Sequence, residues 1–398
     1  MGKPLKIAIG VHGRFHAFGL AAGLLKLGHD VTVFTNYPAF IAARFGIPAQ
    51  RVRGFAMHGV VMRLADRFRL FERMPGFDGF LHGWFGSWLA RRLTAERWDA
   101  TYTWSSVSKE YLECERVARA RLVARGSTHI RRQWQLLHEE EMRTGCVISK
   151  PSEAIMQREE AEYALADAVI VLSSFSRQTF LEAGLPPEKV WLMVSAVHVA
   201  DFAVTPEVVQ ARRQRIISGE PLRVLSVGTF SHRKGALDLV AMAGALPADQ
   251  FQFRFVGSVA DEAAVLAEKS RGRIEFIPRV PQKELREHYE WADIFVLPSI
   301  EEGLAAVLPQ AAAAGLLLLA TPNSGAADVI QEGVTGWIMA VRDVAAFTQR
   351  LNWIACHRLE MAALAESCSQ LTSRDWQKAA DDFVRCCERA HDTYHSCT

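Results

Sequence analysis

Short apolar segments alternate with helical patterns along the whole chain, and this alternation limits the possible folds more than any other feature. The strand-like segments of the first half are KIAIGV, DVTVFT, ATYTWS, RLVARGS, AVIVLSS and KVWLMVSAV. Those of the second half are RVLSVGTF, FQFRFVGS, RIEFIP, IFVLPS, LLLLATP and GWIM. Continuous apolar strands separated by helices are typical of parallel sheets covered on both faces. We therefore expect an α/β protein with doubly wound parallel sheets.

The chain is long enough for two such units, because 398 residues favour two domains, each with its own core. The strand segments form two sets separated by AVTPEVVQARRQRIISGEP at residues 203–221. This segment is polar, contains Pro and Gly, and has no strand pattern, so we interpret it as the domain linker. The C-terminal stretch from SRDWQKAADDF onward has helical spacing. Such a helix would either cap the second domain or brace the first.

Composition excludes several classes of protein. The formal charge of +2 gives no reason to expect a nucleic-acid partner. The start MGKPLKIAIGV leads into a strand pattern and is not expected to be a signal peptide, and no run of 18 apolar residues is present. Seven Cys without CxxC spacing argue against a disulfide framework or a zinc site. A cytoplasmic protein is expected.

Two polar motifs follow strands in the second half. Arg233 and Lys234 come after RVLSVGTF and just before a Gly that opens a helix. Cations beside a helix N-terminus suit a diphosphate, although a solvated basic loop is the alternative. EEGLAAVLPQ follows IFVLPS, and its carboxylates could accept hydrogen bonds from sugar hydroxyls or merely begin a helix. Because Pro309 favours a first helical turn, the helix should begin near Leu308, after an irregular turn.

A third polar turn follows the next strand of the second half. Asn323, Ser324 and Gly325 come after LLLLATP. A Gly-rich turn can approach a ligand closely, and an ordinary connection between a strand and a helix is the alternative.

The first half offers a Gly-containing loop and a polar cluster. Gly10, Gly13 and Gly19 do not form GxGxxG, which argues against dinucleotide binding. Arg125, Ser127 and His129 crowd the end of a strand, where an N-cap opening a helix is the alternative to a functional role.

Residues 51–97 are unusually basic and aromatic. They hold nine Arg and four acidic residues, a local net charge of +5, mixed with Phe and Trp. Such a mixture suits an anionic lipid surface. Helices with a core of aromatics and solvated Arg side chains are the alternative, and we favour it.

The segment LPSIEEGLAAVLPQAAAAG resembles the signature of nucleotide-sugar glycosyltransferases of family 4, the group 1 type with the GT-B fold. VGTFSHRKG, ELREHYEWADIFVLPS, GAADVIQEGVTGWIM and SRDWQKAADDF resemble further parts of the family in the same order, and GRFHAFGLAAGLLKLGHDVTVFT and EAEYALADAVIVLSSFSRQTFLEAGLPPEKV resemble its first half. The resemblance implies two Rossmann-like domains whose parallel sheets face each other across a cleft. It implies an acceptor-side domain at 1–205, a nucleotide-sugar-binding domain at 206–374, and a helix at 375–398 that crosses back to the first domain.

The resemblance also assigns roles to individual residues. Those it places at the reaction centre are His129, Arg233, Lys234 and Glu302, and those on the donor are Gly13, Arg14, Gly303, Leu304 and Gln310. His16, Arg125 and Ser127 would lie on the acceptor side. Three positions depart from the family. Gln310 replaces its second acid, Thr229 replaces its usual Arg, and Ser-Ala-Val-His replaces its Asn-Gly-Val-Asp at residues 195–198.

The implied function is transfer of a sugar from a nucleotide-diphosphate sugar to a glycan or lipid-linked acceptor, with retention of configuration. Polysaccharide or lipopolysaccharide synthesis is the family's common role, and contact with the inner membrane face is one expectation. Neither a metal nor a cofactor is expected. The alternatives are a sugar-nucleotide epimerase of the same fold and a non-catalytic sugar-nucleotide-binding subunit.

Overall fold

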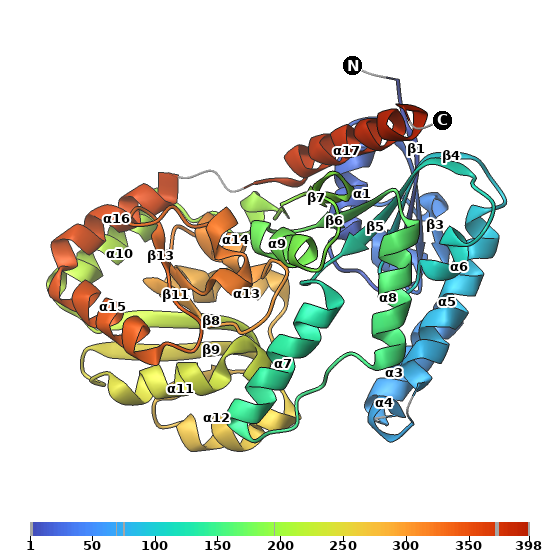
Figure 1. The fold of residues 1–398 in the computed structure, drawn as a ribbon. Helices are drawn as coiled ribbons and strands as arrows, with labels where there is room; N and C mark the ends of the chain where they lie inside the picture. The colour runs from blue at the N-terminus through green and yellow to red at the C-terminus, as the bar shows by residue number, and fades with distance from the viewer. Residues whose placement is uncertain (1–2, 69, 75, 195, 371–373, 397–398) are drawn as a thin grey trace.

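The computed structural model describes residues 3–68, 70–74, 76–194, 196–370 and 374–396, which form two α/β domains (Figure 1). The first domain has a seven-stranded sheet in the order β3-β2-β1-β4-β5-β6-β7, with every neighbouring pair parallel. Its strands are β1 Lys6–Val11, β2 Asp30–Thr35, β3 Val52–Gly54, β4 Trp98–Trp104, β5 Ala118–Arg125, β6 Ala168–Val171 and β7 Val190–Leu192. The short β3 has two exposed residues, so no apolar pattern predicts it.

The second domain has a six-stranded parallel sheet in the order β10-β9-β8-β11-β12-β13. Its strands are β8 Leu222–Phe230, β9 Phe251–Val259, β10 Ile274–Ile277, β11 Ile294–Leu297, β12 Leu317–Ala320 and β13 Gly336–Ile338. Buried apolar clusters cover both faces of this sheet. The expectation of two doubly wound parallel sheets is therefore confirmed.

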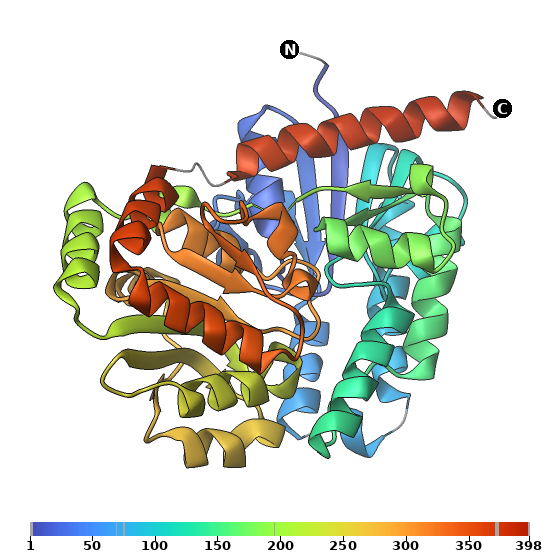
Figure 2. The ribbon, with the colours of Figure 1, turned by 60° about the vertical axis from the view of Figure 1, so that its left-hand side comes forward.

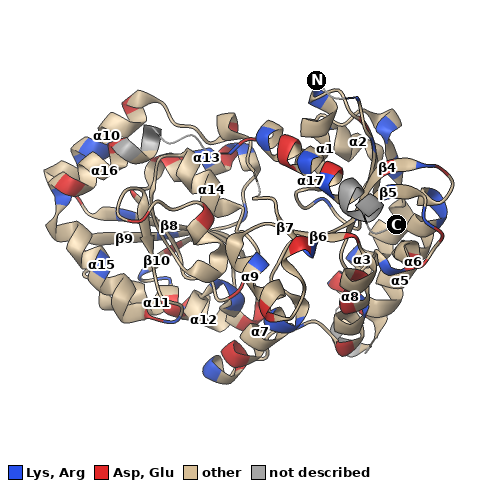
Figure 3. Ribbon diagram, turned by 45° about the horizontal axis from the view of Figure 1, so that its top comes forward, with Lys and Arg blue, Asp and Glu red and all other residues tan. Residues whose placement is uncertain are grey.

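Helices lie on both faces of each sheet (Figure 1). In the first domain they are α1 Ala17–Lys26, α2 Ala39–Ala43, α3 Ala56–Arg67, α4 Leu70–Arg73, α5 Phe77–Leu93, α6 Lys109–Leu112, α7 Ile130–Thr144, α8 Glu153–Leu165 and α9 Ser174–Glu182. The following helices are α10 Pro206–Ser218, α11 Ala236–Ala245, α12 Ala264–Ser270, α13 Gln282–Trp291, α14 Val307–Ala313, α15 Val344–Cys356, α16 Arg358–Gln370 and α17 Trp376–Ser396. Acidic and basic residues are interspersed over both domains (Figure 3). No described helix is long and apolar enough to cross a bilayer.

The interpretation of residues 203–221 as a linker is wrong for most of its length. Helix α10 fills the segment, with Pro206 in its first turn. The guanidinium of Arg212 is fully buried and donates to the carbonyls of Ala314, Gly315 and Tyr289 in the second domain. The sequence does not predict this packing, because a polar segment is expected to be exposed. Here one of its charged residues is buried and is bound by backbone acceptors.

Helix α17 lies across the first domain, although it follows the second domain in sequence (Figure 2). The ring of Phe383 packs 5.0 Å from that of Tyr102, and Ala379 and Ala380 are fully buried. A Cβ on Gly19 of α1 would lie 2.2 Å from the Trp376 ring, so the two helices can approach only because Gly19 has no side chain. Of the two placements open from the sequence, the structure has the one on the first domain.

Candidate active site between the domains

Loops that follow three parallel strands meet where the two domains face each other. Arg233 and Lys234 follow β8, and the acidic pair Glu301 and Glu302 follows the neighbouring strand β11. Ser127 follows β5 of the first domain and contacts Glu301. The carboxyl ends of parallel strands are the place where α/β proteins bind ligands. The structure therefore brings together four of the predicted residues: Arg233, Lys234, Glu302 and Ser127.

Glu301 lies at the centre of this cluster and is fully buried. Its Oε2 lies 2.8 Å from Nη2 of Arg233. Its Oε1 accepts hydrogen bonds from the hydroxyls of Ser127 and Thr128. Burial alone would raise the pKa of this carboxyl, but Arg233 and the two hydroxyls lower it below its usual value. Glu301 thus ties the second domain to the first as a carboxylate.

The ammonium of Lys234 contacts the Glu302 carboxylate directly. Burial, and then the neighbouring Arg233 guanidinium, lower the pKa of Lys234 to about 7. A quarter of the Lys234 side chain and a tenth of the Glu302 side chain are exposed. An anion that binds here would compete with Glu302 for the ammonium.

The loop after Glu302 is irregular, as Pro309 predicts, and α14 begins at Val307. The N–H groups of Glu302 and Ala305 donate to the carbonyls of Asn323 (3.0 Å) and Ser324 (3.1 Å). Within the described parts of the chain, the N–H groups of Gly303 and Leu304 between them have no acceptor. The Asn323–Gly325 turn therefore braces the loop and leaves two donors free.

Gly303 is required for a close approach between the domains. A Cβ at this position would lie 2.2 Å from the carbonyl oxygen of Gly126. The hydroxyl of Ser173, also in the first domain, donates to the Gly303 carbonyl. Only a residue without a side chain fits here.

A pocket of about 160 Å³ is lined by the predicted donor residues Arg14 and Gln310, from the two domains, and by His16, a predicted acceptor-side residue. The Oε1 of Gln310 accepts a hydrogen bond from the Tyr289 hydroxyl at 3.0 Å, so its amide N–H₂ stays available as a donor. The pocket is also lined by His198, from the stretch where the chain departs from the family pattern.

The first-domain residues of this pocket are held by local contacts. The guanidinium of Arg14 lies 4.7 Å above the Phe45 ring, and Nε2 of His16 lies 2.9 Å from the Tyr102 hydroxyl. Burial lowers the pKa of His16 to about 3, so its imidazole is neutral. Gly13, a predicted donor residue, is not part of the pocket lining, and its carbonyl accepts from the Thr35 hydroxyl at 3.0 Å.

Two predicted residues lie outside the charged cluster. His129 is the N-cap of α7, and its ring packs between Tyr163 and Phe180. Its pKa is lowered to about 4, chiefly by burial. Arg125 is buried and binds Glu159 at 3.1 Å. The helix-cap alternative thus describes His129 better than contact with the charged cluster, since none of its hydrogen bonds or ring contacts reaches that cluster.

A larger cleft of about 520 Å³ opens beside Arg233 and Arg125. Asp78 and His82 of α5 and Lys150 also line it, and the sequence patterns single out none of these. His82 Nδ1 is buried without a hydrogen-bond partner in the described structure, and burial lowers its pKa to about 4. These residues are scattered in sequence, so only the fold reveals that they share a cleft.

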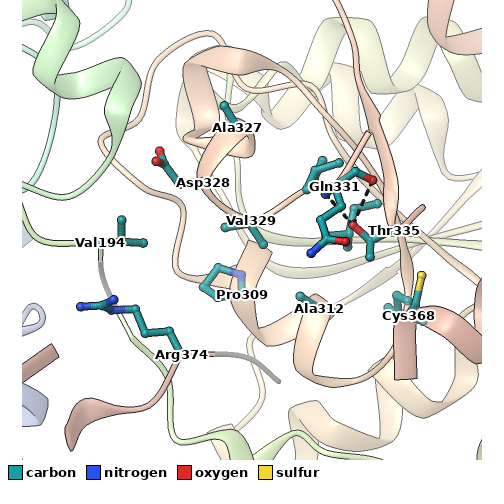
Figure 4. Close-up of a pocket in the computed structure, with 13 residues that line it drawn as sticks. Val194, Pro309, Ala312, Ala327, Asp328, Val329, Gln331, Thr335, Cys368 and Arg374 are labelled. Atoms are coloured by element: carbon teal, nitrogen blue, oxygen red, sulfur yellow. Dashed lines mark hydrogen bonds between the residues drawn. The ribbon is translucent and has the colours of Figure 1, made fainter. Parts of the chain in front are cut away.

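A separate pocket of about 360 Å³ borders a different face of α14 (Figure 4). Pro309 and Ala312 line it, with Asp328 and Arg374 at one end. It holds none of the site residues predicted from the sequence.

Sequence comparison finds the relatives of this chain among glycosyltransferases. Residues 221–357 match the sequence profile of glycosyl transferases group 1. The amylovoran biosynthesis glycosyltransferase AmsK of Erwinia amylovora is 26% identical over 197 residues, 46% of each chain. The D-inositol 3-phosphate glycosyltransferase of Geodermatophilus obscurus is 27% identical over 244 residues, 57% of this chain and 53% of the relative. The chain thus spans about half the length of the curated relatives it matches.

Solved structures resemble nearly the whole chain. Anabaena HepE in complex with UDP and glucose has a TM-score of 0.66 at 14% identity, with 96% of this chain and 99% of HepE covered. Sucrose-phosphate synthase from Thermosynechococcus elongatus has a TM-score of 0.66 at 17% identity, with 98% and 100% covered. The chain therefore has the GT-B fold, and its second domain carries the match to glycosyl transferases group 1.

Proposed function

We propose that this protein is a glycosyltransferase that moves a sugar from a nucleoside-diphosphate sugar to a glycan or lipid-linked acceptor. One observation carries the proposal. Arg233, Lys234 and Glu302 lie together at the carboxyl edge of the second sheet. The free N–H groups of Gly303 and Leu304 follow directly in the same loop. Cations and N–H groups bind a diphosphate, and a carboxylate accepts from sugar hydroxyls. The relatives are named as glycosyltransferases, and the UDP and glucose bound to HepE agree with this donor class.

In the proposed reaction the leaving group is the nucleoside diphosphate, which gains negative charge as the bond to the sugar breaks. Lys234 and the two N–H groups stabilise that charge, and preorganised donors of this kind lower the barrier without reorganising. Glu302 then exchanges its contact with Lys234 for the sugar hydroxyls. Gln310 donates from its amide to the ribose, since its carbonyl is engaged by Tyr289.

We assign the acceptor to the 520 Å³ cleft, because it adjoins Arg233 and is lined from both domains. Closing the two domains on donor and acceptor holds them together and excludes water. We propose that configuration is retained and that no metal takes part, with Arg233 and Lys234 supplying the positive charge. Polysaccharide or lipopolysaccharide synthesis in the cytoplasm is the proposed setting. The described cysteines, none of which is in a disulfide, fit a reducing compartment.

Turnover tests this proposal directly. Nucleoside-diphosphate sugars are incubated with the protein, with and without a membrane extract as acceptor source, and release of nucleoside diphosphate is measured. Lys234→Ala and Glu302→Ala should each lower acceptor-dependent release by about 100- to 1,000-fold, the usual cost of losing one charge-stabilising group. Lys269→Ala on α12, an exposed Lys outside the site, is the control and should leave release unchanged.

The same assay separates the alternatives. Conversion of the donor sugar without any acceptor would indicate an epimerase, and binding without turnover would indicate a non-catalytic subunit. Release should persist in excess chelator. Loss of release that a divalent ion restores would contradict the metal-free part of the proposal.

A further inference from the structure

The outer face of α3 is apolar, although it faces solvent. Met57, Val60, Leu64 and Phe68 are between 47% and 60% exposed. Their spacing of three and four residues places them on one side of the helix, and the buried His58 and Ala65 lie about 100° around the helix from that side. A surface helix of a soluble protein usually turns its apolar side inward. A continuous outward apolar stripe therefore indicates a binding surface.

Arginines flank this stripe. Arg53, Arg63 and Arg67 are exposed, and in the part of the chain that the structure describes Arg63 and Arg67 form no ion pair. Asp66 is the only acidic residue of α3. The stripe thus has a positively charged border whose charges are free to meet an external anion.

The stripe is extended by exposed residues near the start of α5. The rings of Phe77 and Phe80 stack at 6.1 Å, and Phe71 packs 6.2 Å from Phe77. Phe80 is 64% exposed and Met74 is 49% exposed. Figure 1 shows α3, α4 and the start of α5 at one end of the first domain, away from α17 and both chain termini.

We propose that this end of the first domain docks peripherally on a membrane that contains anionic lipid. The docking surface consists of Met57, Val60, Leu64, Phe68, Met74 and Phe80 with Arg53, Arg63 and Arg67. Apolar side chains on a helix lying in the plane of a membrane enter the boundary between headgroups and acyl chains, and Arg side chains beside them attract anionic headgroups. The charge border favours this occupant over a neutral apolar protein surface.

This assignment revises the favoured interpretation of residues 51–97 as helices with core aromatics. Phe85 and Trp88 are indeed buried in the core. Phe68 and Phe80 are not, since they are 55% and 64% exposed. The basic and aromatic stretch therefore contributes to both the core and the surface.

The docking surface and the acceptor cleft share one helix. Asp78 and His82 of α5 line the cleft, and they are four residues apart on one side of it. Phe80 lies midway between them, which turns it to the opposite side at about 100° per residue. On the basis of the proposed function, docking would hold the mouth of the cleft beside the membrane, where a lipid-linked acceptor would be found.

Vesicle flotation of the full-length protein tests the docking surface without any substrate. The protein should float with vesicles of phosphatidylglycerol and phosphatidylcholine, and poorly with phosphatidylcholine alone. A variant with Leu64→Gln and Phe68→Gln should bind at least about tenfold more weakly, because two apolar anchors are lost. The matched control is Val265→Gln with Leu359→Gln, which removes two apolar residues of the second domain that are even more exposed (68% and 74%) and should bind like the wild type.

Charge removal provides the second arm of the test. Arg63→Gln with Arg67→Gln should weaken binding by about fivefold for each charge, and added salt should mimic the change. The proposal fails if the protein does not float with anionic vesicles, or if the Leu64 and Phe68 variant binds as well as the control. A dimer in analytical ultracentrifugation that the same variant abolishes would identify a second copy of the chain as the occupant and would also overturn it. Turnover on a soluble acceptor is measured separately, so the two proposals can fail independently.

Discussion

Lys234 is the residue on which the electrostatics of the site depend. Its ammonium touches Glu302, while burial and Arg233 lower its pKa to about 7. A diphosphate that enters the site supplies the negative charge that keeps the lysine protonated. Binding of the donor and protonation of Lys234 should therefore be linked.

This linkage predicts how donor affinity depends on pH. Because only the ammonium form attracts the diphosphate, affinity for a nucleoside-diphosphate sugar should fall as pH rises above 7, by up to about tenfold per pH unit. The diphosphate of the sugar nucleotide does not itself titrate between pH 7 and 9. Titration calorimetry across this range measures the slope. Lys234→Arg keeps its charge and should give a flat profile, and an equally steep profile in that variant would exclude Lys234 as the titrating group.

At this scale the sequence indicates that Arg233, Lys234 and Glu302 lie close together, because each follows a strand at the carboxyl edge of a parallel sheet. It does not predict Glu301 as the residue that joins the domains. The acid itself is visible beside Glu302, but its partners Ser127 and Thr128 are more than 170 positions away in sequence. His129 caps α7 in the structure, because a polar residue after a strand can cap a helix as well as face a ligand, and its role at the reaction centre stays a prediction.

At the scale of elements, the loop between β11 and α14 acts as one unit. Asn323 and Ser324 accept its outer N–H groups, Ser173 holds the Gly303 carbonyl, and the inner N–H groups are left free. The late start of α14 could be predicted from Pro309 because a proline fits only the first helical turn. The burial of α10 could not be predicted from the sequence, because an Arg such as Arg212 is expected to be exposed unless the carbonyls that it binds are known.

Gly303→Ala tests whether this loop needs the close contact with the first domain. The new methyl group would lie 2.2 Å from the Gly126 carbonyl, so the loop or the domain must shift. We expect turnover to fall at least about tenfold, and overpacking to reduce the free energy of unfolding by about 1–3 kcal/mol. Gly272→Ala, at a position with open space around its Cβ, is the control. Wild-type turnover in Gly303→Ala would show that the contact is dispensable.

At the scale of the whole molecule, α7 connects the domains through a chain of ion pairs. Arg143 binds both Glu140 of its own helix and Asp238 of α11, at 2.6 and 2.7 Å. Arg342 of the second domain lies 2.9 Å from the same Glu140, which is fully buried. These contacts help to hold the two domains in the arrangement that brings Ser127 to Glu301. Only the three-dimensional structure reveals them, because no local pattern marks a pair that spans two domains.

Removing one of these bridges should open the molecule without damaging the donor site. Arg342→Ala leaves Glu140 paired with Arg143, so the fold should survive while the closed arrangement loses an interdomain contact. We expect a larger radius of gyration in small-angle X-ray scattering, with turnover reduced more than donor affinity. Arg271→Ala, an exposed Arg of the second domain that pairs within its own helix region, serves as the control. An unchanged radius and unchanged turnover would mean that this bridge does not control closure.

The central claim is that the cluster around Lys234 binds a nucleoside diphosphate, and ligand-dependent thermal unfolding tests it most directly. A panel of nucleoside diphosphates and their sugars is added to the wild-type protein and to Lys234→Ala. A ligand at 100 times its dissociation constant should stabilise the wild type by about 2.7 kcal/mol, and the variant should lose most of this gain. Stabilisation by no member of the panel, or equal stabilisation of Lys234→Ala, would contradict the account.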